Sequence, residues 1–150
     1  MITTEEIKAL REETGLSIIQ CQKALEEAGG NKEKAITLLK EKGTEIAAKK
    51  GDRTLGSGVV ASYIHSGDAV GVMIELLCET DFVAKNPEFK SVARDIAMHI
   101  AAMKPADTAE LIEQPFIKDV GLKIGELISN TVQKFGERVE IGQFARFSIN

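Results

Sequence analysis

The chain has 150 residues, 43% of them hydrophobic, which suffices for one ordinary domain or for a small helical module joined to a larger domain. Its net charge of −4, from 23 acidic against 19 basic residues, argues against tight binding to a phosphate backbone, so we expect no direct nucleic-acid ligand. The first residues carry neither a basic region nor an apolar run, and no segment has the length of a membrane span, so we expect neither a secretion signal nor a membrane partner.

The first 50 residues predict three short helices. Capping boxes, in which a hydroxyl and the side chain three residues later satisfy free N–H groups reciprocally, mark two helix starts, at Thr3 and Ser17. Asn31 begins the third helix, and Gly43 is expected to end it, because glycine readily adopts the positive φ of a helix end. We interpret residues 1–50 as a three-helix module that looks like a ubiquitin-associated (UBA) domain.

A larger domain follows a polar, glycine-containing linker, predicted at residues 51–57. Within residues 58–150, apolar and polar side chains first alternate with the period of two that is typical of a strand with one buried face, and two later segments show the apolar stripe of a helix. The domain is therefore predicted to be α+β, a small antiparallel sheet with helices packed on one face. Its predicted elements are two hairpin strands, two helices and a last strand, at Val59–His65, Val70–Cys78, Pro87–Met103, Lys123–Phe135 and Val139–Ile149.

The connection between the second strand and the first of these later helices carries a large apolar side chain, Phe82. The helix begins soon after it, because Asn86 can accept a hydrogen bond from a free first-turn N–H and Pro87 suits the first helical position. Such connections run over the surface, so Phe82 either folds back as a lid on the core or points outward for a partner. The pattern favours neither alternative.

The segment Thr80-Asp81-Phe82-Val83 resembles the signature of the elongation factor Ts family. Further segments that are similar to this family occur in the family's order, two before this segment and four after it, and together they extend over nearly the whole chain. They lie at Leu10–Gly15, Cys21–Leu25, Ala97–Ala102, Gln114–Phe116, Gly136-Glu137 and Arg146-Phe147.

The chain departs from this family in two respects. Only a short link joins Pro105 to Leu111, where members usually carry a longer helical excursion. The chain also has one copy of the hairpin core, whereas longer members have two related copies. The second half of their partner surface is therefore expected to come from elsewhere or to be missing.

The resemblance implies a translation elongation factor that acts as a guanine-nucleotide exchange factor. Such a protein binds elongation factor Tu in its GDP-bound and nucleotide-free forms, disturbs the magnesium site there and promotes GDP release for GTP reloading. The resemblance assigns the disturbing contact to Thr80, Asp81, Phe82 and Val83. Because this action is binding and not covalent chemistry, we expect no cofactor and no metal site in the chain itself.

The resemblance also assigns a docking surface on the helical module, at Arg11 and the apolar pair Ile18 and Ile19. Adjacent helical residues point about a quarter-turn apart, so only one of this pair fits fully into a three-helix core and the other is expected to be exposed. His65, at the hairpin turn, has an ordinary interpretation as an exposed turn histidine, whereas the family carries a histidine near elongation factor Tu at this position. His99, in the packed helix, is interpreted as structural.

The two cysteines, Cys21 and Cys78, form no paired-spacing motif, so we expect neither a disulfide nor a zinc site and interpret both as small buried hydrophobes in a reducing cytoplasm. Cys78 with either histidine is formally a nucleophilic pair, yet no motif places a base, an orienting group and an oxyanion donor together. The chain is therefore not expected to be an enzyme.

Two further expectations concern assembly and the alternative function. A lone three-stranded sheet leaves an edge and part of an apolar face uncovered, so we expect a homodimer through the α+β domain, which would recreate the two-copy core. The alternative that the sequence leaves open is a UBA-like adaptor that binds peptides or proteins, with the α+β domain serving for dimerisation.

Overall fold

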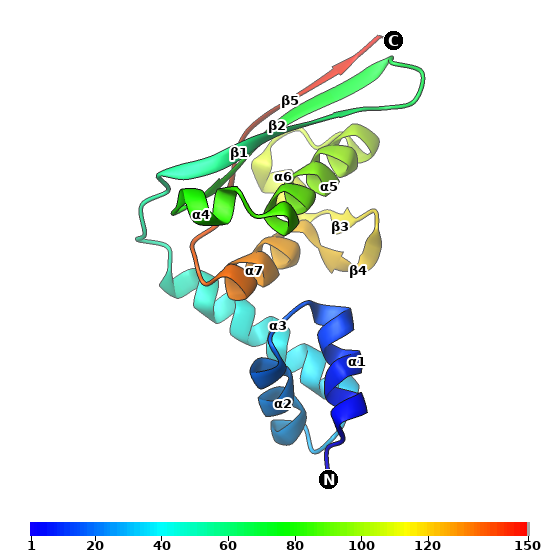
Figure 1. Cartoon of the computed structure of the whole chain (residues 1–150). Helices are drawn as coiled ribbons and strands as arrows, with labels where there is room; N and C mark the ends of the chain where they lie inside the picture. Colours follow the sequence, from blue (N-terminus) through cyan, green and yellow to red (C-terminus); the bar gives the residue numbers. More distant parts are fainter. Residues whose placement is uncertain (150) are drawn as a thin grey trace.

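The computed structural model describes residues 1–149, and in the view of Figure 1 a helical module lies below an α+β domain. The module consists of α1 (Thr4–Thr14), α2 (Ile18–Glu27) and α3 (Lys32–Lys49). Both predicted capping boxes are present, and the side chain of Asn31 caps α3 as predicted. The three helices enclose a core of their own, made of Leu10, Leu16, Cys21, Ala24, Leu25, Ala35 and Leu39.

The α+β domain is built on a three-stranded antiparallel sheet in the order β1 (Ser57–Ile64), β2 (Val70–Cys78) and β5 (Glu140–Ser148). The predicted hairpin and last strand are confirmed, with their ends shifted by two residues or fewer. One face of the central strand is buried, as its alternating pattern predicted. The buried side chains of β2 are Val72, Ile74, Leu76 and Cys78.

Helices cover one face of this sheet, as predicted (Figure 1). α5 (Pro87–Met103) lies against β1 and β2 with the bounds predicted for it, and α7 (Ile124–Phe135) adds its apolar side to the same core. The rings of Phe89 and Phe135 meet edge to face with centroids 5.9 Å apart, which joins the two helices. Gly136 ends α7 with a φ of 72°, again as predicted. The α+β fold class is therefore confirmed.

Four short elements were not predicted from the sequence. They are α4 (Asp81–Ala84), α6 (Thr108–Glu113) and a two-stranded hairpin of β3 (Pro115–Phe116) with β4 (Asp119–Lys123). α4 occupies the corner between β2 and α5, whereas α6 and the small hairpin connect α5 to α7. Elements this short contain too few residues for hydrophobic periodicity to reveal them.

α3 does not end at Gly43, so that prediction is wrong. The helix runs on to Lys49, and Gly43 is buried within it, where an added Cβ would lie 2.9 Å from Oε1 of Gln133 on α7. The glycine therefore allows a close approach of two helices and does not serve as a helix end. Beyond it, Ile46 and Ala47 pack against the core of the α+β domain, so α3 contributes to both parts of the fold.

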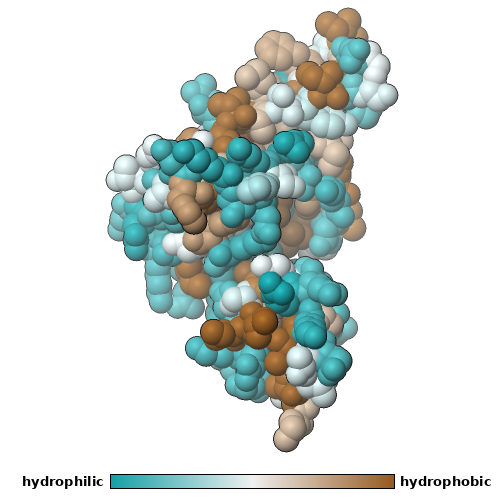
Figure 2. Space-filling view, in the orientation of Figure 1, coloured by the Kyte–Doolittle hydropathy of each residue, from teal (hydrophilic) through white to brown (hydrophobic). Residues whose placement is uncertain are grey.

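The other face of the sheet is open among the described residues and carries apolar side chains. Val60, Ile64, Met73 and Phe147 are each more than half exposed. In Figure 2, brown side chains gather toward the tip of the sheet at the top of the view, where β5 ends. An uncovered apolar face of this kind is a surface on which a partner can bind.

Candidate functional site

The corner after β2 presents one large apolar side chain to solvent. Phe82 is 86% exposed, whereas its neighbours Val83 and Ala84 are 5% and 6% exposed and pack into the core. The short helix α4 thus has a buried side and an outward side, and Phe82 lies on the outward side. Of the two alternatives that the sequence left open for Phe82, the structure supports the outward one.

A pair of carboxylates fixes the backbone of this corner. One oxygen of Glu137 accepts hydrogen bonds from the backbone N–H groups of Glu79 at 3.1 Å and Thr80 at 3.0 Å, and the other accepts one from the Thr80 hydroxyl at 2.7 Å. In return, the carboxylate of Glu79 accepts a bond from the backbone N–H of Arg138 at 2.5 Å. We name this group of Glu79, Thr80, Glu137 and Arg138 the corner clasp. It joins segments that lie 57 residues apart in the sequence.

Two further hydrogen bonds hold the predicted segment from Thr80 to Val83. The hydroxyl of Ser57, at the start of β1, donates to Oδ1 of Asp81 at 2.7 Å. The hydroxyl oxygen of Thr80 caps α4 by accepting a bond from the backbone N–H of Val83 at 3.4 Å. Thr80, Asp81 and Val83 are thus engaged within the fold, and the ring of Phe82 extends away from it.

Cys78 lies beneath the corner and is buried. Its thiol donates a hydrogen bond to the carbonyl oxygen of Thr80 at 3.3 Å. Burial raises the pKa of the Cys78 thiol, and the negative charge of Glu137 raises it further. A thiol that stays protonated is a poor nucleophile, which agrees with a packing role. Cys21 is buried as well, and both cysteines are free, as predicted.

The predicted docking residues of the helical module all lie on its surface. Arg11 is exposed on α1, and Ile18 and Ile19 begin α2 with 52% and 66% of their surface exposed. The prediction that one of the two isoleucines fits into the core is wrong, because Leu16 of the preceding loop packs there instead, at 3% exposure. The first turn of α2 therefore presents two neighbouring apolar side chains to solvent.

His65 lies at the opposite end of the hairpin from the corner. It is exposed, and its Nδ1 is 2.9 Å from the hydroxyl of Tyr63. Ser57 contacts the corner and Ile64 ends β1, and at about 3.3 Å per residue these two ends of the strand are roughly 23 Å apart. The structure therefore does not bring His65 together with Phe82.

His99 is buried in the core, as its interpretation as a structural residue predicted. Its Nε2 lies 2.9 Å from Oε1 of Gln114, and the backbone N–H of Ile117 donates to its Nδ1 at 3.2 Å. Because Nδ1 accepts a hydrogen bond, the neutral ring carries its proton on Nε2, which donates to Gln114. Burial lowers the pKa of His99, and the hydrogen bond to Gln114 opposes this shift in part.

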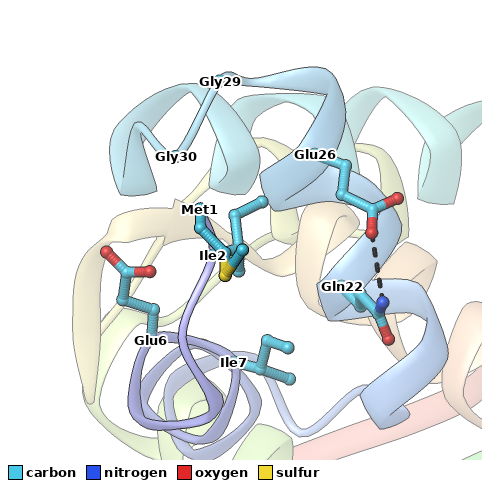
Figure 3. A pocket seen from close by; sticks show the side chains of 8 residues that line it. All are labelled: Met1, Ile2, Glu6, Ile7, Gln22, Glu26, Gly29 and Gly30. Carbon is cyan, nitrogen blue, oxygen red and sulfur yellow. Dashed lines mark hydrogen bonds between the residues drawn. The ribbon is translucent and has the colours of Figure 1, made fainter.

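A hollow of about 760 Å³ opens on the helical module beside the N-terminus (Figure 3). Its titratable side chains are Glu6 and Glu26, and both serve local structure: Glu6 accepts from the backbone N–H of Thr3, and Glu26 accepts from the amide of Gln22. Across residues 1–149, no three His, Cys, Asp or Glu side chains gather as metal ligands would. No helix in the same range is long and apolar enough to cross a membrane.

The corner clasp was not predicted from the sequence. Gly136-Glu137 was only one of the segments that carry the family resemblance, and no role was predicted for the carboxylate. No periodicity or spacing indicates that Glu137 reaches Thr80, because the two residues come from different elements. The one local signal was the glycine at the end of α7, which predicts a sharp turn there and leaves the direction of the next side chain open.

Comparison with known proteins gives matches over nearly the whole length of the chain. A sequence model of the family described as Elongation factor TS matches residues 79–150. Elongation factor Ts of Carboxydothermus hydrogenoformans is 40% identical over 194 aligned positions, which cover 99% of this chain and 89% of that protein. Those of Desulforamulus reducens and Thermodesulfovibrio yellowstonii are each 39% identical, covering 99% of this chain and 89% and 96% of the relatives. The alignments exceed the 150 residues of the chain, so these relatives carry residues that it lacks.

Proposed function

The chain belongs to the elongation factor Ts family, and on that premise we propose that it is a guanine-nucleotide exchange factor that binds GDP-bound elongation factor Tu and promotes release of the GDP. The observation that carries the proposal is Phe82, an aromatic side chain that is 86% exposed on a corner with a fixed backbone. A ring on a rigid support suits the anchor of an interface, because little conformational entropy is lost when it binds. The proposal makes the chain a translation elongation factor of the cytoplasm.

The proposed mechanism is a wedge that acts on the partner's magnesium site. By the family resemblance, Phe82 enters between two helices of elongation factor Tu, and Asp81 beside it helps to shift the helix that positions the ion. Magnesium demands a near-octahedral shell with bonds of about 2.0–2.1 Å, so a small displacement of its ligands weakens the binding of both the ion and GDP.

Exchange then follows from the linkage between the two binding equilibria. A factor that weakens GDP binding by some ratio is itself bound more weakly by that same ratio when GDP is present. Re-entry of GTP or GDP therefore expels the factor, which can act again on another molecule of elongation factor Tu. The chain makes and breaks no covalent bond in this cycle and needs no cofactor.

We assign docking to a surface apart from the corner. Arg11, Ile18 and Ile19 lie exposed on the helical module and would hold the partner while the corner acts. α3 packs against both cores, so it fixes the distance between this surface and Phe82. His65, at the far end of the hairpin, would contact a different part of elongation factor Tu.

We propose further that two copies of the chain pair through the open face of the sheet. Val60, Ile64, Met73 and Phe147 give this face an exposed apolar character, which marks an interaction site in a protein of this size. Two-fold closure buries the same face of both copies. The pair would recreate the two-copy core that the family resemblance attributes to longer members.

Release of labelled GDP from purified elongation factor Tu, followed with and without the chain, tests the proposed function. We expect release to accelerate with increasing concentration of the chain until it saturates, and excess GDP to dissociate the complex. A release rate that stays unchanged at every concentration would contradict exchange activity. The adaptor alternative predicts that outcome, because an adaptor binds without loosening the nucleotide.

A further inference from the structure

We propose that Glu137 is a positioning residue of the exchange site, whose carboxylate sets the direction in which Phe82 meets the partner. The inference rests on the proposed function and adds to it a residue outside the contact segment. Glu137 acts through the backbone of Glu79 and Thr80, to which it is hydrogen-bonded. The proposed role requires no contact between Glu137 and the partner.

The helix that carries Phe82 is too short to hold its own direction. α4 has four residues, whereas isolated helices shorter than about 12 residues are marginal in water. It begins directly after Thr80, so its direction depends on what fixes the backbone there. The side chain of Glu137 accepts three hydrogen bonds there, from the backbone N–H groups of Glu79 and Thr80 and from the Thr80 hydroxyl.

The other supports of the corner do not replace these bonds. Val83 and Ala84 pack by apolar contact, which is non-directional. The hydroxyl of Ser57 bonds to the side-chain carboxylate of Asp81, so this contact restrains the backbone of the corner only indirectly. Glu137 accepts three hydrogen bonds from Glu79 and Thr80, and hydrogen bonds weaken steeply when their angles change, so Glu137 supplies the main directional restraint.

The turn that carries Glu137 is fixed on both sides. Before it, Gly136 ends α7 in the left-handed conformation with a φ of 72°. After it, the backbone N–H of Arg138 donates to the carboxylate of Glu79, and the Arg138 guanidinium donates to the carbonyl oxygen of Arg53 at 2.6 Å. A restraint anchored in this way can transmit a fixed direction to the corner.

Two substitutions separate the geometry of Glu137 from its charge. Glu137→Gln removes the charge and keeps the length: its amide oxygen can accept both backbone bonds, and its amino group can donate to the Thr80 hydroxyl oxygen. Glu137→Asp keeps the charge but is one methylene shorter, so it cannot reach all three donors. A positioning role predicts that Glu137→Gln keeps the rate of GDP release and that Glu137→Asp lowers it. A role of the charge predicts that Glu137→Asp keeps the rate and that Glu137→Gln lowers it.

The first measurement is GDP release from elongation factor Tu over a range of factor concentrations, which separates the maximal rate from the half-saturating concentration. We expect Glu137→Asp to lower the maximal rate about tenfold or more, since displacing a reacting or binding group by about 1 Å has effects of this size. The half-saturating concentration should change by less than about threefold, because the docking residues are distant. Glu140→Ala removes a neighbouring carboxylate that contacts Arg138, and this matched control should keep the wild-type maximal rate.

The second measurement uses the chain without elongation factor Tu. The sequence contains no tryptophan, so Phe82→Trp introduces a single fluorescent reporter at the corner. Time-resolved anisotropy then measures how freely the indole moves. In the double variant with Glu137→Asp, the indole should show a larger amplitude of fast motion. In the double variant with Glu137→Gln, its motion should match that of the Phe82→Trp parent. This readout separates failure of the inference from failure of the proposed function, because it requires no exchange activity.

Rates are compared per folded molecule, from thermal melts of the same preparations. The inference is overturned if Glu137→Asp keeps both the maximal rate and the restricted motion of the reporter. It is equally overturned if Glu137→Gln loses as much rate as Glu137→Asp, because the geometry alone would then not suffice and the charge would be required as well. A lower melting temperature of the Asp variant with an unchanged rate per folded molecule would reduce Glu137 to a stabilising role.

Discussion

Gly43 and Gln133 lie so close together that a Cβ on Gly43 would be 2.9 Å from Oε1 of Gln133. A Cβ atom essentially never lies this close to a non-bonded atom, so an added Cβ would require the end of the Gln133 side chain to shift. The oxygen is buried, and among the described residues it has no hydrogen-bond partner. The pair lies where α3, which links the helical module to the α+β domain, packs against α7.

Gly43→Ala is expected not to raise the free energy of unfolding, although alanine in a helix interior is ordinarily about 1 kcal/mol more favourable than glycine. Crowding against Gln133 should offset this helical gain. Urea unfolding followed by circular dichroism measures the effect. The control is the same substitution in a Gln133→Ala background, where the gain of about 1 kcal/mol should return. An equal effect in the two backgrounds would show that these residues do not interact.

If the helical module docks on elongation factor Tu, substitution of its exposed apolar residues should lower the affinity for that partner and leave the stability of the fold unchanged. The double variant Ile18→Lys with Ile19→Lys should weaken binding to elongation factor Tu at least about tenfold, because it places two charges where apolar surface should be buried. Since both side chains are exposed, the melting temperature should change little. Val120→Lys alters an exposed apolar residue on β4, which is even more exposed than the two isoleucines, and should keep wild-type affinity. Titration by calorimetry would contradict the assignment if both variants bound alike.

The sequence predicted the larger elements because their signals are local. The capping boxes at Thr3 and Ser17 are completed within three residues, and the stripe of α5 repeats over several turns. Gly43 was misinterpreted because a glycine that ends a helix and one that admits a neighbouring helix are identical in sequence. Only the position of Gln133, which belongs to another element, distinguishes the two.

The candidate site was predictable in part for the same reason. The place of Phe82 on a surface connection follows from the strand before it and the helix after it, but its outward direction does not. That direction depends on Glu137, which reaches the corner from the far end of α7. Likewise, the exposure of both Ile18 and Ile19 depends on Leu16 packing into the core from a loop, which no helical period describes.

Pairing through the open face of the sheet predicts a mass of twice 16.3 kDa at micromolar concentration. Light scattering coupled to size exclusion measures it. Met73→Lys with Phe147→Lys should return a monomer, because each charge would be buried without a partner in the interface. Ile19→Lys alters exposed apolar surface on the other part of the fold and should leave the dimer intact. A wild-type chain that elutes as a monomer would contradict the pairing proposed here.

The lowered pKa of His99 predicts that the folded chain loses stability on mild acidification. Its pKa is lowered in the folded chain, so the unfolded chain binds the proton more tightly and protonation favours unfolding. The contribution is fully present above the ordinary pKa of about 6.5 and is lost as the pH falls below it toward the lowered folded value. Protonation of Nδ1 would also break the bond from the Ile117 N–H.

The measurement for His99 is the free energy of unfolding between about pH 7 and pH 5, below which carboxylates titrate as well. Wild-type stability should fall over this window, and His99→Gln should be less stable at pH 7 but flatter across it. His65→Gln changes the exposed histidine and should retain the wild-type slope. Equal slopes for wild type and His99→Gln would show that another group causes any acid sensitivity.

The wedge mechanism predicts that substitutions at two adjacent residues, Phe82 and Val83, have opposite effects on exchange and on stability. Phe82→Ala should slow stimulated GDP release about thirtyfold, the equivalent of the roughly 2 kcal/mol that an aromatic anchor contributes to an interface. Its melting temperature should stay near the wild-type value, because the ring is 86% exposed. Asp81→Ala should slow release more mildly, because a polar contact at an interface contributes less than a buried ring.

Val83→Ala is the matched counterpart of Phe82→Ala. Val83 is 5% exposed, so its truncation should cost roughly 1–2 kcal/mol of folding stability through the lost methyl groups and the cavity they leave. Because the Val83 side chain packs into the core and does not face outward, the molecules that remain folded should keep nearly normal exchange. Thermal melts and stimulated GDP release measured on the same preparations separate the two effects. A Phe82→Ala variant that is destabilised yet fully active would show that the ring covers the core, and the wedge mechanism would have to be abandoned.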